Sequence, residues 1–117
     1  MKTNKYLVTG GAGFIGSNLV DELVRQKHRV LIIDNLSTGK KNYLNPKAKF
    51  FKRDITDYKS IEPLFKGVDY VFHLAAMARI QPSIIDPATS FNNNVLGTFN
   101  VLLASKNNWV KKIVYSA

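Results

Sequence analysis

Short apolar runs recur along this chain, separated by stretches in which apolar residues return every three or four positions. Residues 5–9 and Val30–Ile33 are largely apolar runs that stop at a glycine and at an aspartate, as buried strands do. Between them, Ile15, Leu19 and Leu23 recur at four-residue spacing, which predicts an amphipathic helix from Phe14 to about His28. The chain therefore opens with a strand, a helix and a second strand.

The same alternation continues to the last residue. A polar loop leads to a short third strand at Phe50-Phe51, and Val68–Phe72 predicts a fourth strand. Residues 57–66 between them predict a brief helix that points Tyr58, Ile61, Leu64 and Phe65 inward.

A longer helix and a final strand complete the pattern. Asp86-Pro87 is typical of a helix start, because Asp caps the first amides and Pro fits the first helical position. Residues 111–116 predict a fifth strand. The helix between them carries an apolar stripe of Phe91, Val95, Phe99, Leu102 and Leu103.

Strands that are apolar throughout and alternate with helices predict a parallel sheet covered on both faces. Right-handed crossovers then favour the order 3-2-1-4-5, the doubly wound α/β arrangement of a Rossmann fold. We expect residues 1–117 to form one domain, because that length suits a single core. The loop after a fifth strand normally helps to form the ligand crevice, so we also expect a fragment truncated after strand five.

Composition narrows the class of protein. The apolar fraction of 45% excludes a disordered chain, and the absence of cysteine excludes disulfides, zinc ribbons, iron–sulfur clusters and thiol nucleophiles. No apolar run reaches the roughly 18 residues of a membrane span, and the first residues do not form a secretory signal. We therefore expect a cytoplasmic protein with no membrane partner and no metal site.

The net charge of +9 comes from 17 Lys and Arg against 8 Asp and Glu, and it gathers in residues 40–53, which contain no acid. A basic patch attracts phosphate, so a nucleic-acid-binding module is an alternative hypothesis. However, the aromatics Tyr43, Phe50 and Phe51 do not alternate with the charges as a base-stacking surface would. We favour a solvated loop followed by a lysine-protected edge strand.

The segment from Gly10 to Gly16 carries the clearest chemical signal. It reads G-x-x-G-x-x-G and lies between the first strand and the first helix. One glycine allows a sharp turn, a second lets a diphosphate approach the backbone, and Gly16 lets helix and strand pack closely. The amides at the helix N-terminus then attract phosphate, so the motif predicts a dinucleotide site.

Asp34 at the end of the second strand supplies the acid that this motif requires. A carboxylate there accepts hydrogen bonds from both ribose hydroxyls and repels a 2′-phosphate, which favours NAD over NADP, although Lys40 and Lys41 nearby weaken that preference. The hypothesis needs loop amides that are not covered by protein and a carboxylate that is not engaged away from the loop.

Three other candidates have structural alternatives. Asp54 follows the third strand, where its carboxylate either meets an adenine amino group or forms a turn. His73 precedes small residues, and we favour a structural role over a general base. Tyr43 and Lys47 have the spacing that activates a tyrosine on a helix, but Asn45-Pro46 disfavours a helix there, so we treat the spacing as coincidence.

Five segments together carry a family resemblance: Thr9 to Gly16, residues 34–39 (DNLSTG), residues 53–55 (RDI), residues 73–76 (HLAA) and residues 94–98 (NVLGT). In this order and spacing they resemble the extended short-chain dehydrogenase/reductase family, and within it the NAD-dependent nucleotide-sugar epimerases and dehydratases. The resemblance runs along the whole chain. It is specific for the family and much less so for the substrate.

The resemblance implies a set of residues around a bound NAD. Gly10, Gly13, Phe14, Ile15 and Gly16 would hold the pyrophosphate; Asp34 and Asn35 would hold the adenosine ribose, with Ser37, Thr38 and Gly39 lining that side; Asp54 and Ile55 would meet the adenine; Leu74, Ala75 and Ala76 would meet the nicotinamide half; and Asn94 would brace the loop after the fourth strand.

The family's catalytic machinery lies beyond this set. A serine or threonine follows the fifth strand near Ser116-Ala117, a Tyr-x-x-x-Lys pair comes tens of residues later, and a C-terminal domain binds the nucleotide sugar. Many of the family's epimerases have a lysine where this chain has Ala78-Arg79, which puts the galactose pathway in doubt.

The resemblance therefore implies the NAD-binding part of a 4-epimerase for UDP-glucose or UDP-N-acetylglucosamine, or of a related dehydratase or decarboxylase. A UDP-sugar would be a partner only of a longer parent. We expect the 117 residues alone to be inactive, to contain no catalytic residue and to self-associate through uncovered surfaces.

Overall fold

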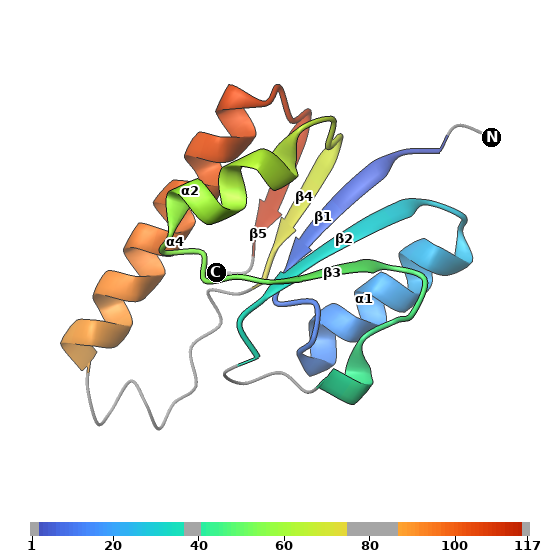
Figure 1. The fold of residues 1–117 in the computed structure, drawn as a ribbon, viewed down its shortest axis with the longest axis horizontal. Helices are drawn as coiled ribbons and strands as arrows, with labels where there is room; N and C mark the ends of the chain where they lie inside the picture. The colour runs from blue at the N-terminus through green and yellow to red at the C-terminus, as the bar shows by residue number, and fades with distance from the viewer. Residues whose placement is uncertain (1–2, 37–40, 75–86, 116–117) are drawn as a thin grey trace.

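The computed structural model describes residues 3–36, 41–74 and 87–115, with side chains from Val95 onward in the last range. Among these described residues, no helix is both long enough and apolar enough to cross a membrane. The elements in chain order (Figure 1) are β1 (Lys5–Thr9), α1 (Phe14–Arg25), β2 (Arg29–Asp34), the 3₁₀ turn η1 (Lys41–Tyr43), β3 (Lys49–Lys52), α2 (Tyr58–Ile61), the 3₁₀ turn η2 (Glu62–Phe65), β4 (Tyr70–His73), α4 (Pro87–Asn107) and β5 (Lys112–Tyr115).

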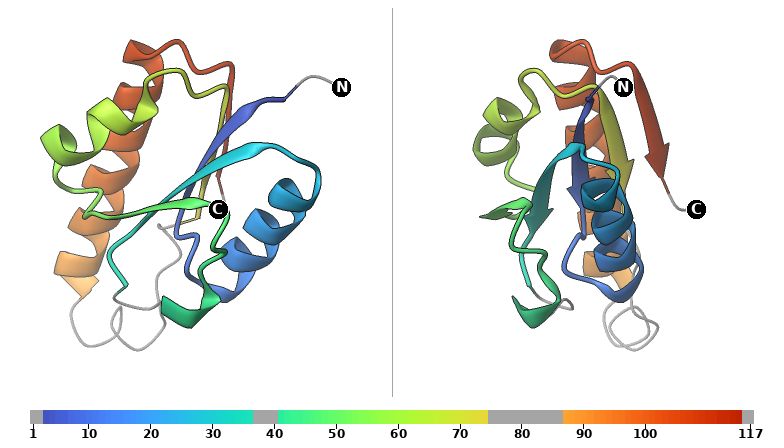
Figure 2. Two further views of the ribbon diagram at one scale, coloured as in Figure 1. Left: turned by 45° about the vertical axis from the view of Figure 1, so that its right-hand side comes forward. Right: turned by 90° about the vertical axis from the view of Figure 1, so that its right-hand side faces the viewer.

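The five strands form one parallel sheet in the order β3-β2-β1-β4-β5, which confirms the predicted doubly wound arrangement. Figure 2 shows α1 on one face of the sheet and α2 and α4 on the other. Because all strands run the same way, their carboxyl ends share one edge. Thr9 at the end of β1 is opposite Ile33 on β2 and His73 on β4, so the loops that follow these strands leave the sheet together.

Two apolar cores lie on either side of the sheet, because successive strand residues point to opposite faces. Leu7 of β1 belongs to one core and its neighbour Val8 to the other. The first core joins the sheet to α2, η2 and α4 through Leu7, Leu31, Ile33, Ile61, Phe65, Val71, Val101 and Ala104. The second joins the sheet to α1 through Val8, Val20, Leu23, Val30 and Ile32.

The first helix is shorter than predicted, because α1 ends at Arg25 and not near His28. Lys27 adopts a left-handed backbone with φ 69°, its amide donates to the Val24 carbonyl at 2.9 Å, and the His28 amide donates to the Leu23 carbonyl at 3.1 Å. This pair of bonds is the Schellman motif that ends many helices. Ile15, which the spacing placed on the buried face, is also exposed.

The predicted apolar stripe on the long helix is wrong for the residues whose side chains the structure describes. Val95, Phe99 and Leu102 are exposed, and Leu103 is partly buried. The face of α4 against the sheet instead carries Gly97, Asn100, Val101, Ala104 and Ser105.

The reason for this reversal is the close approach of α4 to the loop after β3. A Cβ at Gly97 would lie only 2.5 Å from Cδ1 of Ile55, and Asn100 Nδ2 donates to the Ile55 carbonyl at 2.8 Å. Only small residues and one hydrogen-bonding amide fit at this distance, so the larger apolar side chains face outward.

Two other expectations agree with the structure. In residues 57–66, Ile61 and Phe65 are fully buried while Tyr58 and Leu64 pack against them, although η2 with Pro63 replaces the second half of the predicted helix. The third strand is an edge strand, and its terminal residues Lys49 and Lys52 are both exposed. The described part of the basic segment is therefore a solvated edge.

Candidate functional site

The chain turns sharply as it leaves β1. Gly10 has φ +77°, a conformation that residues with a Cβ adopt at a cost, and its amide donates to the Ile33 carbonyl of β2 at 2.8 Å. The Gly10 carbonyl then accepts a hydrogen bond from the Gly13 amide at 3.1 Å, which closes the turn. These two bonds hold the glycine loop, residues 10–16, at the carboxyl edge of the sheet.

Two glycines of this loop are required by the protein's own packing. A Cβ at Gly11 would lie 2.6 Å from Cγ2 of Ile32, and a Cβ at Gly16 would lie 2.2 Å from the Gly10 carbonyl oxygen. We expected Gly16 to allow contact between helix and strand. The structure shows that it allows α1 to begin directly against the backbone of the loop itself.

Gly13 has a different reason to be glycine. Its backbone is extended, with φ −79° and ψ 171°, which any residue adopts, and a Cβ there would meet only the Gly10 oxygen at 3.4 Å. Gly13 is also the N-cap of α1 and contributes no side-chain cap. Neither conformation nor packing within the described protein therefore requires a glycine here, which points to something that approaches from outside.

At the first turn of α1, the groups suited to holding an anion are backbone amides and not side chains. An α-helix leaves its first amides without intrahelical acceptors, and here these belong to Phe14, Ile15 and Gly16. The Phe14 side chain is 74% exposed and that of Ile15 is 53% exposed. The helix N-terminus also carries partial positive charge, so the arrangement suits an anion held by main-chain amides.

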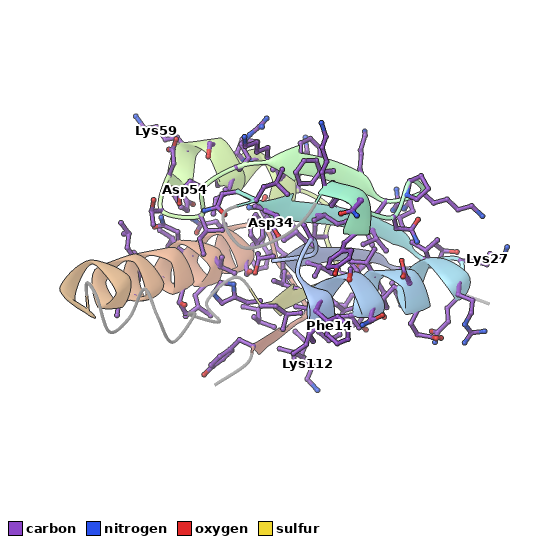
Figure 3. All side chains as sticks on the ribbon, turned by 90° about the horizontal axis from the view of Figure 1, so that it is seen from below. Phe14, Lys27, Asp34, Asp54, Lys59 and Lys112 are labelled. Carbon is purple, nitrogen blue, oxygen red and sulfur yellow. The ribbon has the colours of Figure 1, made fainter. Side chains whose placement is uncertain are left out.

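Asp34 at the end of β2 lies against the same loop. Its side chain is buried, Oδ2 accepts a hydrogen bond from the Ala12 amide at 3.0 Å, and Oδ1 accepts one from the Leu36 amide at 2.7 Å. Each oxygen keeps a second lone pair, so the carboxylate can accept two further bonds. Oδ2 is thus engaged on the glycine loop, in line with the dinucleotide hypothesis, while Oδ1 is engaged on the turn that follows β2. Figure 3 labels Asp34, at the end of β2, and Phe14, at the start of α1.

Asp54 and Ile55 follow β3 at the same edge. The Asp54 side chain is exposed, and its Oδ1 accepts hydrogen bonds from the Thr56 amide at 2.9 Å and the Thr56 hydroxyl at 2.8 Å. The turn alternative for Asp54 is therefore present in the structure, and contact with adenine stays a prediction. Ile55 is partly buried against Gly97.

His73 at the end of β4 is enclosed by hydroxyl groups. Its Nδ1 lies 2.7 Å from Oγ1 of Thr9 and its Nε2 lies 3.0 Å from Oγ1 of Thr98. Burial lowers the pKa of the ring to about 4, so the imidazole is neutral at physiological pH. These contacts agree with the favoured structural role, which stays a prediction. Leu74 follows, and its amide donates to both the carbonyl and the hydroxyl oxygen of Thr9 at 3.0 Å.

Some predicted residues cannot be placed. Ser37, Thr38, Gly39, Ala75 and Ala76 lie outside the described residues, and so does the side chain of Asn94. The described residues contain no group of three or more His, Asp or Glu side chains that could hold a metal.

The spacing of Tyr43 and Lys47 is not that of a helix. Tyr43 ends η1, and the Lys47 amide donates to Asn45 Oδ1 at 2.9 Å. Tyr43 and Lys47 therefore share no helix, and their spacing is a coincidence.

Sequence reasoning missed three residues that shape the site. Ala12 donates its amide to Asp34, while Thr9 and Thr98 hold His73. The position of Ala12 inside the glycine motif was the available signal. Thr98 belongs to the 94–98 segment of the family resemblance, but its link to His73 depends on how α4 packs.

The fold is of the Rossmann type, with a glycine-rich turn between its first strand and first helix. Residues 6–117 match the NAD dependent epimerase/dehydratase family. The chain belongs to this family, as the resemblance indicated.

Relatives and solved structures agree with this assignment. The chain is 39% identical over 115 residues to UDP-glucose 4-epimerase of Lactobacillus helveticus, covering 97% of this chain and 35% of the relative. It is 41% identical over 108 residues to UDP-glucuronic acid decarboxylase 6 of Arabidopsis thaliana, covering 87% and 30%.

Among solved structures, UDP-glucose 4-epimerase of Thermotoga maritima with UDP-glucose has a TM-score of 0.92 at 42% identity, covering 97% of this chain and 37% of that one. The Thermus thermophilus UDP-glucose 4-epimerase complex with NAD has a TM-score of 0.86 at 39% identity, covering 93% and 36%. The chain therefore spans little more than a third of the length of these epimerases.

Proposed function

We propose that this chain binds NAD, with the pyrophosphate on the glycine loop and the adenosine ribose on the Asp34 carboxylate. Gly13 is the observation that carries the proposal, because no contact within the described protein explains why it is glycine. A diphosphate that must reach the amides of the first turn of α1 does explain it. The binding set is the one that the resemblance implies, from Gly10 to Asn94.

The charge of Asp34 supports NAD over NADP. The carboxylate already accepts two amide hydrogen bonds, and its remaining lone pairs suit the two ribose hydroxyls. A 2′-phosphate in that place would bring a second anion against the buried Asp34 carboxylate, which is unfavourable.

We further propose that residues 1–117 act as the NAD-binding domain of a nucleotide-sugar 4-epimerase. Bound NAD supplies a hydride acceptor and donor in such an enzyme. The residues assigned here would bind and orient it, while His73, bonded to two threonine hydroxyls, would keep the structural role. We therefore expect no turnover of UDP-sugars by these 117 residues alone. We also propose that a UDP-sugar is a partner only of a longer protein, and that this protein is cytoplasmic.

A dehydratase or a decarboxylase of the same family is the second candidate. The likeness to UDP-glucuronic acid decarboxylase 6 of Arabidopsis thaliana supports it, since the identity is similar to that of the epimerases. Residues 6–117 match an NAD dependent family whichever of these reactions applies, so the binding proposal does not depend on this choice.

Titration calorimetry with NAD and NADP tests the proposal on the wild type, Asp34→Asn and Asp57→Asn. Asp57 is a matched control, because it is an exposed acid that caps α2 without a side-chain hydrogen bond. We expect the wild type and Asp57→Asn to prefer NAD by about tenfold or more, and Asp34→Asn to lose that preference. A folded wild type, verified by circular dichroism, that binds neither nucleotide at millimolar concentration would refute the proposal.

A further inference from the structure

A chain of hydrogen bonds joins three residues that are distant in sequence, one of which directly precedes the glycine loop. Thr9 Oγ1 lies 2.7 Å from His73 Nδ1, and His73 Nε2 lies 3.0 Å from Thr98 Oγ1. The three residues come from the end of β1, the end of β4 and the middle of α4. Thr9 and His73 are both almost fully buried.

Thr9 is the residue from which the glycine loop departs. It precedes Gly10 directly, and its carbonyl and its hydroxyl oxygen both accept the Leu74 amide at 3.0 Å. With His73 bonded to the same hydroxyl, Thr9 is held from the β4 side by both its backbone and its side chain. The direction in which Gly10 leaves the sheet therefore depends on these bonds.

Thr98 links α4 to His73, because its hydroxyl group bonds Nε2 of the ring. Its neighbour Gly97 allows α4 to approach Ile55 closely, and Asn100 donates to the Ile55 carbonyl at 2.8 Å. These contacts fix α4 against the loop after β3. The hydroxyl of Thr98 then meets Nε2 at a set place, so the orientation of the imidazole depends on α4 as well as on β1.

The hydrogen bonds of Thr9, His73 and Thr98 fix the orientation of the imidazole ring and do not add apolar burial. Apolar side chains of the same size would fill this space without a desolvation penalty, whereas a buried polar group is costly when it loses its partner. A neutral imidazole bonded at both nitrogens accepts only one ring orientation, since rotation breaks both bonds.

We propose that His73 and Thr98 are positioning residues for the NAD pyrophosphate, acting through Thr9 on the glycine loop. This inference rests on the proposed NAD site. It makes cofactor affinity depend on α4, although Thr98 belongs to that helix and not to the glycine loop. Neither residue acts as a catalytic group.

The experiment compares Thr98→Val, Thr98→Ser and Ser105→Ala in the whole chain. Valine replaces the hydroxyl group by a methyl group of similar size and leaves Nε2 without its partner, while serine keeps the hydroxyl and loses only the methyl group. Ser105 is a matched control, because it is buried on the same face of α4 and its hydroxyl has no hydrogen-bond partner in the described structure. Two readouts are taken: the Kd of NAD by calorimetry, and the amide NMR signals of Gly10 and Gly13 without ligand.

We expect Thr98→Val to weaken NAD binding by about fivefold or more and to shift both glycine signals. Thr98→Ser and Ser105→Ala should stay within about twofold of the wild type. Unchanged NAD affinity and unmoved glycine signals in Thr98→Val would overturn the inference. If the wild type itself binds no NAD, the proposed function fails, and the glycine signals still decide whether Thr98 positions the loop. Should Thr98→Val not fold, Thr98→Ala removes the same hydroxyl without placing a new methyl group.

Discussion

Replacing Gly13 and Gly16 separately by alanine distinguishes a glycine kept for a ligand from a glycine kept for the fold. The two residues lie three positions apart in the same loop, and each substitution adds one methyl group. At Gly13 the new Cβ would meet only the Gly10 oxygen, at 3.4 Å. At Gly16 it would lie 2.2 Å from that same oxygen and 2.9 Å from the Gly10 carbonyl carbon.

These distances set the expected magnitudes. The Gly13 backbone suits alanine, so the lower entropy of the unfolded chain roughly offsets a poorer N-cap, and stability should change by less than about 1 kcal/mol. At Gly16 the backbone has to move by about 1 Å to restore contact, which costs about 3 kcal/mol, comparable to severe overpacking. In the bound state, the methyl group at Gly13 displaces the phosphate from the amides. Loss of one charge-assisted hydrogen bond of about 1.5–3 kcal/mol weakens binding about tenfold or more.

Urea unfolding monitored by circular dichroism and titration with NAD measure the two effects on the same preparations. Gly13→Ala should unfold near the wild-type midpoint and bind NAD at least about tenfold more weakly. Gly16→Ala should unfold at a clearly lower urea concentration. The reasoning is refuted if Gly13→Ala binds NAD with wild-type affinity, or if it loses as much stability as Gly16→Ala.

Three other outcomes follow from the structure. Trp109 has φ 61° at the end of α4, where glycine is favoured, and is 89% exposed, so Trp109→Gly should raise the free energy of unfolding by about 1 kcal/mol; an unchanged urea midpoint would contradict this. Burial lowers the pKa of His73 from 6.5 to about 4, so the unfolded chain binds the proton more tightly. Stability from this neutral ring is complete above pH 6.5 and falls by up to about 3 kcal/mol as the pH drops to 4, a slope that urea titrations should find reduced in His73→Asn. Phe99 and Leu102 are exposed on α4, so light scattering should show self-association that decreases in the double variant Phe99→Ser, Leu102→Ser; a monomeric wild type would contradict it.

The order of elements and the sheet topology could be predicted because they depend on local patterns. Apolar runs of strand length stop at polar residues or glycines, and right-handed crossovers leave one favoured order for such strands. The end of α1 was placed three residues too far, since Lys27 adopts the left-handed conformation that a sequence pattern assigns to glycine or asparagine.

The candidate site was predictable where one segment contains the whole signal. Gly10 to Gly16 and Asp34 lie next to strand ends, so their meeting at the carboxyl edge follows from a parallel sheet. Asp54 was undecided, because a carboxylate after a strand forms a turn as readily as it meets a ligand, and the structure shows the turn.

The amino-acid sequence by itself determined the doubly wound sheet, the glycine loop and the acid beside it, because short-range spacing encodes all three. Only the tertiary structure decided which face of α4 is buried, why Gly16 and Gly13 differ, and what surrounds His73. Those answers depend on distances between segments far apart in the chain. The contact of Gly97 with Ile55 and the bond from His73 to Thr98 exist only once α4 has packed against the sheet.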